Sequence, residues 1–100
     1  MGYFPFFVQL QHVPGLIVGG GTVALRKAEK LLPYGPKLTV VAPDICPELA
    51  ALPSITLVRR PFRGEDVGRM AFVIAASGDR ALNHRVARLC REKGIPVNVV

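Results

Sequence analysis

Residues 15–24 read Gly-Leu-Ile-Val-Gly-Gly-Gly-Thr-Val-Ala, an apolar run that leads into three glycines and then into a helical pattern. Within this stretch, Gly19, Gly21 and Ala24 have the G-x-G-x-x-G/A spacing, which turns a strand tightly into a helix whose amino end receives a pyrophosphate. The free N–H groups and the positive end of the helix dipole then face the negative charge of the ligand. The stretch therefore predicts a dinucleotide-binding turn. The alternative is a tight turn with only a structural role.

The rest of the chain alternates between strand and helix patterns. The continuous apolar run at 70–76 is typical of a strand buried on both faces of a parallel sheet. We expect strands at 15–19, 38–42, 55–58, 70–76 and 95–100, and helical segments at 21–34, from Pro43-Asp44 through Leu52, at 64–66 and at 80–93. Right-handed crossovers then give a parallel sheet with the order 3-2-1-4-5. The predicted fold class is α/β: one Rossmann-type NAD-binding domain over residues 1–100, truncated at its fifth strand.

In such a sheet the ligand crevice lies at the carboxyl ends of the strands, between strands one and four, where the strand order reverses. Its expected walls are the glycine turn, the loop after strand two and the loop after strand four. Ser77 in the last of these could reach the nicotinamide side or be an ordinary polar loop residue. No catalytic or metal-ligating residue is assigned, and the candidate cofactor-binding residues are Gly19, Gly20, Gly21, Thr22, Val23, Pro43, Asp44 and Ser77.

The choice between NAD and NADP depends on the end of strand two. An NAD site normally has an acidic residue there for the ribose hydroxyls. Ala42 occupies about that position, and Asp44 follows slightly late. Asp44 could bind the ribose or could cap the short helix that follows. No arginine stands nearby in the sequence to receive a 2′-phosphate, so we expect NAD.

Composition narrows the classes of partner. The 100 residues are enough for one domain, and 13 Lys+Arg against 7 Asp+Glu give a net charge of +6. This excess favours an acidic partner such as cofactor phosphates or a polyanionic metabolite. The basic residues are scattered and not interleaved with aromatics, which argues against a nucleic-acid surface. No apolar run is long enough to span a membrane. Cys46 and Cys90 are isolated and are expected to be reduced and buried in a cytoplasmic protein.

Other conspicuous residues favour structural or solvated roles. The apolar start at residues 1–8 lacks the features of a signal peptide, and we expect it to lie against the edge of the sheet. His84 is expected on a solvated helix face, and His12 lies in a connecting loop without an obvious partner. The arginines in the run 59–63 could clamp carboxylates, although a solvated loop is the ordinary outcome for such a run.

From Ile17 to Lys27 the sequence contains the run V-G-G-G-x-V-A-x-R-K. Further short segments that match the same family pattern lie at 3–6, 41–43, 61–62, 73–76, 83–86 and 96–100. In these segments, which extend over essentially the whole chain, it resembles the amino-terminal domain of siroheme synthases and their stand-alone relatives. That is the precorrin-2 dehydrogenase/sirohydrochlorin ferrochelatase family. The resemblance implies NAD-dependent oxidation of precorrin-2 to sirohydrochlorin, and in bifunctional members insertion of ferrous iron. It also implies a tetrapyrrole polycarboxylate as substrate and a homodimer.

Two departures from the family pattern bear on chemistry. Position 22, often acidic in the family, is Thr22 here. The family's catalytic aspartate would directly follow Val100, and its dimerisation and helical substrate domains would come after that. We therefore expect a fragment that contains the NAD module and none of the acid/base chemistry.

A second class of function is a non-catalytic NAD-sensing module, such as the nucleotide-binding domains that regulate ion transporters. The fold alone does not separate the two classes. The Arg26-Lys27 pair after the glycines and the ending at Asn98-Val99-Val100 favour the enzyme.

Overall fold

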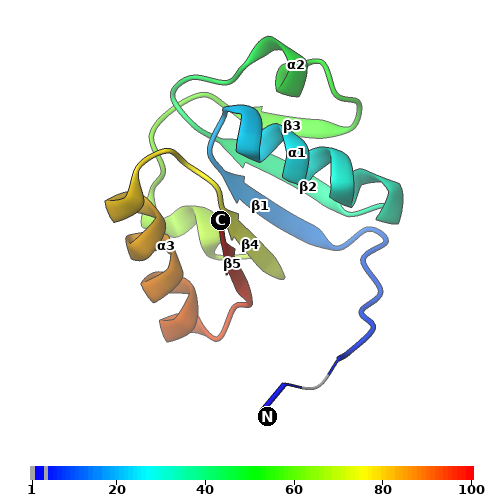
Figure 1. The fold of residues 1–100 in the computed structure, drawn as a ribbon, viewed down its shortest axis with the longest axis vertical. Coiled ribbons are helices and arrows are strands. Elements are labelled where there is room, and N and C mark those ends of the chain that lie inside the picture. The colour runs from blue at the N-terminus through cyan, green and yellow to red at the C-terminus, as the bar shows by residue number, and fades with distance from the viewer. Residues whose placement is uncertain (1, 4) are drawn as a thin grey trace.

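The computed structural model describes residues 2, 3 and 5–100. Five strands form one sheet with the order β3-β2-β1-β4-β5, in which every neighbouring pair is parallel. This is the predicted order, and Figure 1 shows β1 in the middle of the sheet. The strands are β1 (Pro14–Val18), β2 (Lys37–Val41), β3 (Ile55–Val58), β4 (Phe72–Ala75) and β5 (Val97–Val99).

Helices cover both faces of this sheet (Figure 1). They are α1 (Thr22–Leu31), the 3₁₀ turn η1 (Leu32–Tyr34), α2 (Pro47–Ala50), the 3₁₀ turn η2 (Gly64–Val67) and α3 (Arg80–Lys93). One core contains Ala24 and Ala28 of α1 and Leu49 of α2. The other contains Val67 of η2 and Val86 of α3. The crossovers before and after β4 therefore pass on the face opposite to α1.

The two cores follow from the alternation of side chains along a strand. Leu16 and Val18 of β1 belong to the core under α3, whereas Ile17 between them belongs to the core under α1. Because both faces of a central parallel strand are buried, both sets of positions must be apolar. This explains the continuous apolar runs in the sequence.

Local sequence sets most helix ends. Pro33 has no N–H to donate, so the α-helix ends at Leu31 and the chain tightens into η1. Asp79 caps α3 by accepting a hydrogen bond from the N–H of Leu82 at 3.2 Å, and Gly94 ends it with a φ of 70°. The predicted start of the short helix after β2 is wrong: α2 begins at Pro47, not at Pro43-Asp44. Pro47 has the fixed φ that suits a first helical position, and residues 43–46 remain a loop.

The expectation that the apolar start lies against the sheet edge is wrong for the residues described. The side chains of Tyr3 and Phe7 are 97% and 103% exposed, and Val8 is 70% exposed. Residues 1 and 4, which belong to the same expectation, lie outside the described residues. The segment leads into β1, which is the central strand, so it leaves the sheet at the middle of its amino end (Figure 1).

Candidate functional site

A cavity of about 540 Å³ opens at the carboxyl ends of β1, β2 and β4. Its size is within the usual range for a small-molecule site, and it lies at the point where the strand order reverses. All eight candidate residues named from the sequence line it, together with Phe62 from the β3–β4 connection and Leu82 and Arg85 from α3. The glycine turn and the loops after β2 and β4 thus meet around one space.

The three glycines of the turn have three different reasons to lack a side chain. Gly19 has a φ of 137°, and a Cβ there would run into the backbone of Ala76. At Gly20 a Cβ would collide with the carbonyl group of Asp44. A Cβ at Gly21 would meet no atom within 4 Å, because this position faces the open cavity. Gly19 and Gly20 are therefore required by the fold, and Gly21 leaves backbone accessible to a ligand.

The amino end of α1 is prepared for an anion. Gly21 caps the helix without a side-chain hydrogen bond, and the first turn contains no acidic residue. Thr22 and Val23 line the cavity, and their N–H groups lie in the first turn, where a helix offers no intrahelical acceptor. Ala24 is fully buried against the core, so the third small residue of the motif allows close packing of α1 on the sheet.

Asp44 lies on the wall of the cavity with an exposed side chain. It does not cap α2, because the residue before that helix is Cys46 and no side chain caps it. The capping alternative is therefore wrong. The loop that carries Asp44 is attached to the glycine turn by a hydrogen bond, in which the Cys46 N–H donates to the Gly20 carbonyl at 2.7 Å. A carboxylate here can accept hydrogen bonds from ribose hydroxyls.

Ser77 is held by Asn83, a residue that the sequence reasoning did not single out. Its hydroxyl contacts the Asn83 Oδ1 at 2.7 Å, its N–H donates to the same oxygen at 3.1 Å, and its carbonyl accepts from Asn83 Nδ2 at 3.0 Å. Asn83 is 6% exposed. An asparagine on the otherwise apolar inward face of α3 was the available signal, because a buried amide must find partners. Asn83 therefore sets the shape of the β4–α3 loop.

Arg85 lines the cavity as well, with its guanidinium carbon 5.5 Å from the centre of the Phe62 ring. The expectation concerned an arginine near the end of β2 that would receive a 2′-phosphate, whereas Arg85 comes to the cavity from α3. Arg85 was not among the candidate residues because it is far in the sequence from the loop after β2 and reaches the crevice from the second turn of α3. Phe62 is 6% exposed, so it supplies a fixed support for the guanidinium group.

Arg60, in the run that could have clamped carboxylates, has an internal partner. Its guanidinium forms two hydrogen bonds with Asp66, at 2.6 and 2.9 Å. Asp66 also accepts the N–H of Arg63 at 2.8 Å. The Arg60 hydrogen bond lowers the pKa of Asp66 from its ordinary value, with a smaller contribution from Arg63. This pair fixes the loop that leads from β3 into η2.

The histidines and cysteines, whose side chains could act as acids, bases, nucleophiles or metal ligands, do not line the cavity. His84 is exposed on α3 and His12 is exposed before β1. Cys90 is buried, which raises the pKa of its thiol, while Cys46 is half-buried rather than buried as expected. Within residues 2, 3 and 5–100, no three His, Cys, Asp or Glu side chains are grouped as a metal site would require. No helix in the described part of the chain is long and apolar enough to cross a membrane.

Comparison with known proteins identifies relatives of this chain. Residues 6–100 match a family model described as "Putative NAD(P)-binding". The chain is 48% identical over 103 residues to a siroheme synthase of Thioalkalivibrio sulfidiphilus and 45% identical over 103 residues to one of Neisseria meningitidis. These alignments cover 100% of this chain but 21% and 22% of the two synthases, so the chain spans about a fifth of their length.

A solved structure of SirC, a precorrin-2 dehydrogenase, superposes with a TM-score of 0.77 at 31% sequence identity. The match covers 85% of this chain and 44% of that one. The family model and the solved structure agree with the observed fold and its sheet order. The chain therefore belongs to the family of NAD(P)-binding domains that form the amino-terminal part of siroheme synthases and the corresponding part of precorrin-2 dehydrogenases.

Proposed function

We propose that this chain is the NAD-binding module of a precorrin-2 dehydrogenase, which oxidises precorrin-2 to sirohydrochlorin. The observation that carries the proposal is the cavity at the carboxyl end of β1, where an open Gly21 and the amino end of α1 face the same space as Asp44. The similarity to siroheme synthases and to a precorrin-2 dehydrogenase supports the choice of reaction.

The residues of the crevice fit a dinucleotide. We expect the N–H groups of Thr22 and Val23 to bind the pyrophosphate, which the open position at Gly21 would allow to approach the backbone. Asp44 would accept the hydroxyls of the adenosine ribose. The loop at Ser77 would border the nicotinamide. When bound, NAD supplies a hydride acceptor at that ring. The chain's own residues bind and orient the cofactor, and we assign no acid or base among residues 1–100.

We propose NAD rather than NADP as the cofactor because of Asp44. A carboxylate beside the ribose accepts a hydroxyl but repels a 2′-phosphate. Arg85 would favour NADP if it lay beside the ribose, because it is a cation that lines the same cavity and could bind a 2′-phosphate. Its guanidinium lies over Phe62 on the α3 side, whereas Asp44 is on the loop after β2, where the ribose is expected. The carboxylate should therefore dominate at the ribose.

Titration of the chain with NADH and with NADPH, followed by calorimetry, tests the proposal. We expect NADH to bind at least tenfold more tightly. Asp44→Asn should reduce this preference by improving NADPH binding, because it removes the negative charge and keeps the shape. As a matched control, Glu48→Asn removes an exposed carboxylate from α2, outside the cavity, and should leave both affinities unchanged. Equal affinity for the two cofactors, or no binding of either, would refute the proposal.

A further inference from the structure

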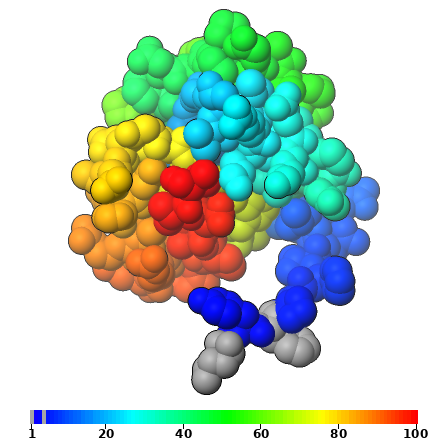
Figure 2. All heavy atoms as spheres, viewed as in Figure 1, coloured from blue at the N-terminus to red at the C-terminus, as the bar shows by residue number. Residues whose placement is uncertain are grey.

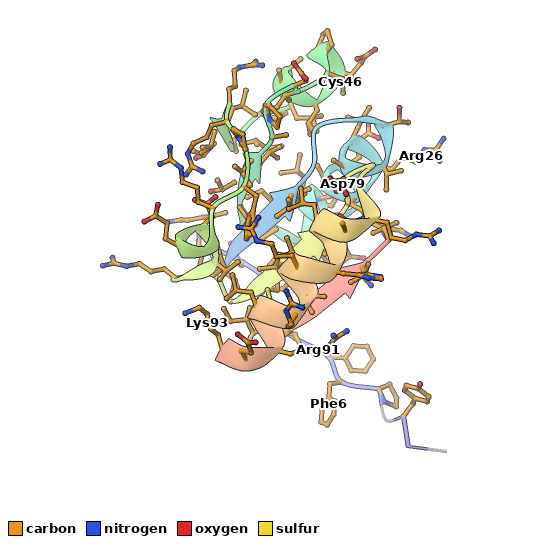
Figure 3. All side chains as sticks on the ribbon, turned by 90° about the vertical axis from the view of Figure 1, so that its left-hand side faces the viewer. Phe6, Arg26, Cys46, Asp79, Arg91 and Lys93 are labelled. Carbon is orange, nitrogen blue, oxygen red and sulfur yellow. The ribbon has the colours of Figure 1, made fainter. Side chains whose placement is uncertain are left out.

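A second hollow, of about 340 Å³, lies beside the dinucleotide crevice. It is lined by Val23, Arg26, Lys27 and Lys30 of α1 and by Val100. In Figure 2 the residues of the carboxyl end, coloured red, lie directly against those of α1, coloured cyan. Figure 3 shows Arg26 projecting outward from α1, away from the sheet. The hollow is thus a feature of the surface and is separate from the two cores.

Three cations line this hollow, and none of them forms an ion pair with the residues that the structure describes. Arg26 and Lys30 are four residues apart on α1, and Lys27 and Lys30 are three apart, so all three occupy neighbouring positions on the helix surface. Like charges at this spacing repel each other. Among the residues that the structure describes, no carboxylate lies within 4 Å of any of them, since the ion pairs recorded there are Arg60–Asp66 and Arg63–Glu65. The arrangement is therefore suited to an external anion.

The hollow adjoins the end of the crevice where the nicotinamide is expected. Val23 lines both spaces. The N–H of Val100 donates to the carbonyl of Ala75 at 3.1 Å, which places the wall of the hollow next to the end of β4. Ala76 and Ser77, which follow β4, line the crevice. A molecule that contacts the nicotinamide from this side can therefore extend acidic groups into the hollow.

We propose that this hollow is a carboxylate-binding subsite in which Arg26, Lys27 and Lys30 hold acidic side chains of the molecule that is oxidised in the neighbouring crevice. The proposal rests on the proposed function, because that function supplies a polycarboxylate as the reacting molecule. The three cations act as positioning residues. They orient the macrocycle toward the nicotinamide and take no part in hydride transfer.

The probe for this subsite is uroporphyrin, a tetrapyrrole octacarboxylate, added to the chain in the presence of saturating NADH. Its affinity is measured from the change in porphyrin fluorescence. The hollow variant carries Arg26→Gln, Lys27→Gln and Lys30→Gln. The control variant carries Arg88→Gln, Arg91→Gln and Lys93→Gln, which remove the same charge from exposed positions of α3. Figure 3 shows Arg91 and Lys93 at the end of the molecule opposite to Arg26 and Asp79.

We expect the hollow variant to bind uroporphyrin at least tenfold more weakly and the control variant to change by less than threefold. NADH affinity, measured separately by calorimetry, should stay the same in both variants. Equal weakening in the two variants would overturn the proposal, because the porphyrin would then respond to net charge alone. Displacement of the porphyrin from the hollow by equimolar inorganic pyrophosphate would also overturn it, since the hollow would then be a phosphate site.

The failure of this proposal can be told apart from failure of the proposed function. If the chain binds NADH but not uroporphyrin, the subsite is refuted while the NAD module stands. If the chain binds neither NADH nor NADPH, the proposed function fails, and with it the reason for expecting an oxidised polycarboxylate.

Discussion

Substitutions at Gly19 and Gly21 should separate the two roles of the glycine turn. Gly19→Ala places a Cβ on a residue with a φ of 137° and against the backbone of Ala76. Gly21→Ala places a Cβ in open space on a residue with a φ of −101°, which any L-residue adopts. The first change should therefore damage the fold, whereas the second should leave it intact.

The expected sizes follow from these surroundings. An unfavourable positive φ costs about 1–3 kcal/mol, and forcing a methyl group into packed backbone costs about 1–3 kcal/mol more. Gly19→Ala should therefore lower the free energy of unfolding by at least about 2 kcal/mol, which for a domain of this size lowers Tm by at least about 8 °C. Gly21→Ala should change Tm by less than about 2 °C, a shift that corresponds to less than about 0.5 kcal/mol.

At position 21 a substitution that leaves the fold intact should nevertheless abolish ligand binding when it introduces charge. Gly21→Asp puts a negative charge beside the expected pyrophosphate. Two like charges about 4 Å apart near a protein surface repel by about 4 kcal/mol, which is about a thousandfold in affinity. Thermal unfolding by circular dichroism and NADH titration by calorimetry measure the two effects. The reasoning is refuted if Gly19→Ala melts like the unaltered chain, or if Gly21→Asp binds NADH with undiminished affinity.

Three further outcomes are expected. Asp66→Ala should lower Tm by several degrees at pH 7. Because the folded state lowers the Asp66 pKa from its ordinary value, this contribution exists above the ordinary pKa and is lost as the pH falls through the folded pKa, so the difference in Tm between the two proteins should shrink as the pH is lowered through that range. Asn83→Ala should remove the three hydrogen bonds that Asn83 makes with the half-buried Ser77 and destabilise the chain by about 1–3 kcal/mol, measured by urea unfolding, whereas Asn98→Ala at an exposed position should have little effect. Residues 1–100 should form a concentration-dependent dimer in sedimentation, because Phe7, Val99 and Val100 are exposed apolar residues, and a strict monomer at all concentrations would contradict this.

The strand order and the walls of the crevice could be predicted because they depend on local patterns. A run such as 70–76 is apolar at every position only where both faces of a strand are buried, and the glycine spacing identifies the strand that begins the nucleotide-binding half. β1 and β2 have the expected length but begin and end one residue earlier, and β4 and β5 are shorter than expected at both ends, because hydrogen bonding between neighbours, not apolar character, ends a strand. The 70–76 run, for example, is paired only as Phe72–Ala75.

The features that escaped prediction depend on contacts between distant segments. Arg85 reaches the cavity because η2 and the loop at Phe62 pack against α3, which no local pattern encodes. Asn83 looked like an ordinary helix residue until its helix face was known to be buried. The start of α2 was misplaced because Pro43 and Pro47 are equally good first residues of a helix in sequence terms. In the structure, α2 begins at the second of these prolines, and the loop before it is hydrogen-bonded to Gly20 through the Cys46 N–H.

That contact joins two parts of the crevice that belong to different loops. Gly20 packs its Cα on the carbonyl of Asp44, and the Gly20 carbonyl accepts the N–H of Cys46. The phosphate-facing turn and the ribose-facing carboxylate therefore belong to one rigid frame, whose spacing is set before any nucleotide arrives. The protein then loses little conformational entropy when a ligand binds. Because the adenosine and pyrophosphate parts of the ligand are covalently linked, binding of one part raises the effective concentration of the other at its own position. A mononucleotide fragment should accordingly bind in the same pose as the whole dinucleotide, with its affinity reduced by the missing half and not by reorganisation of the protein.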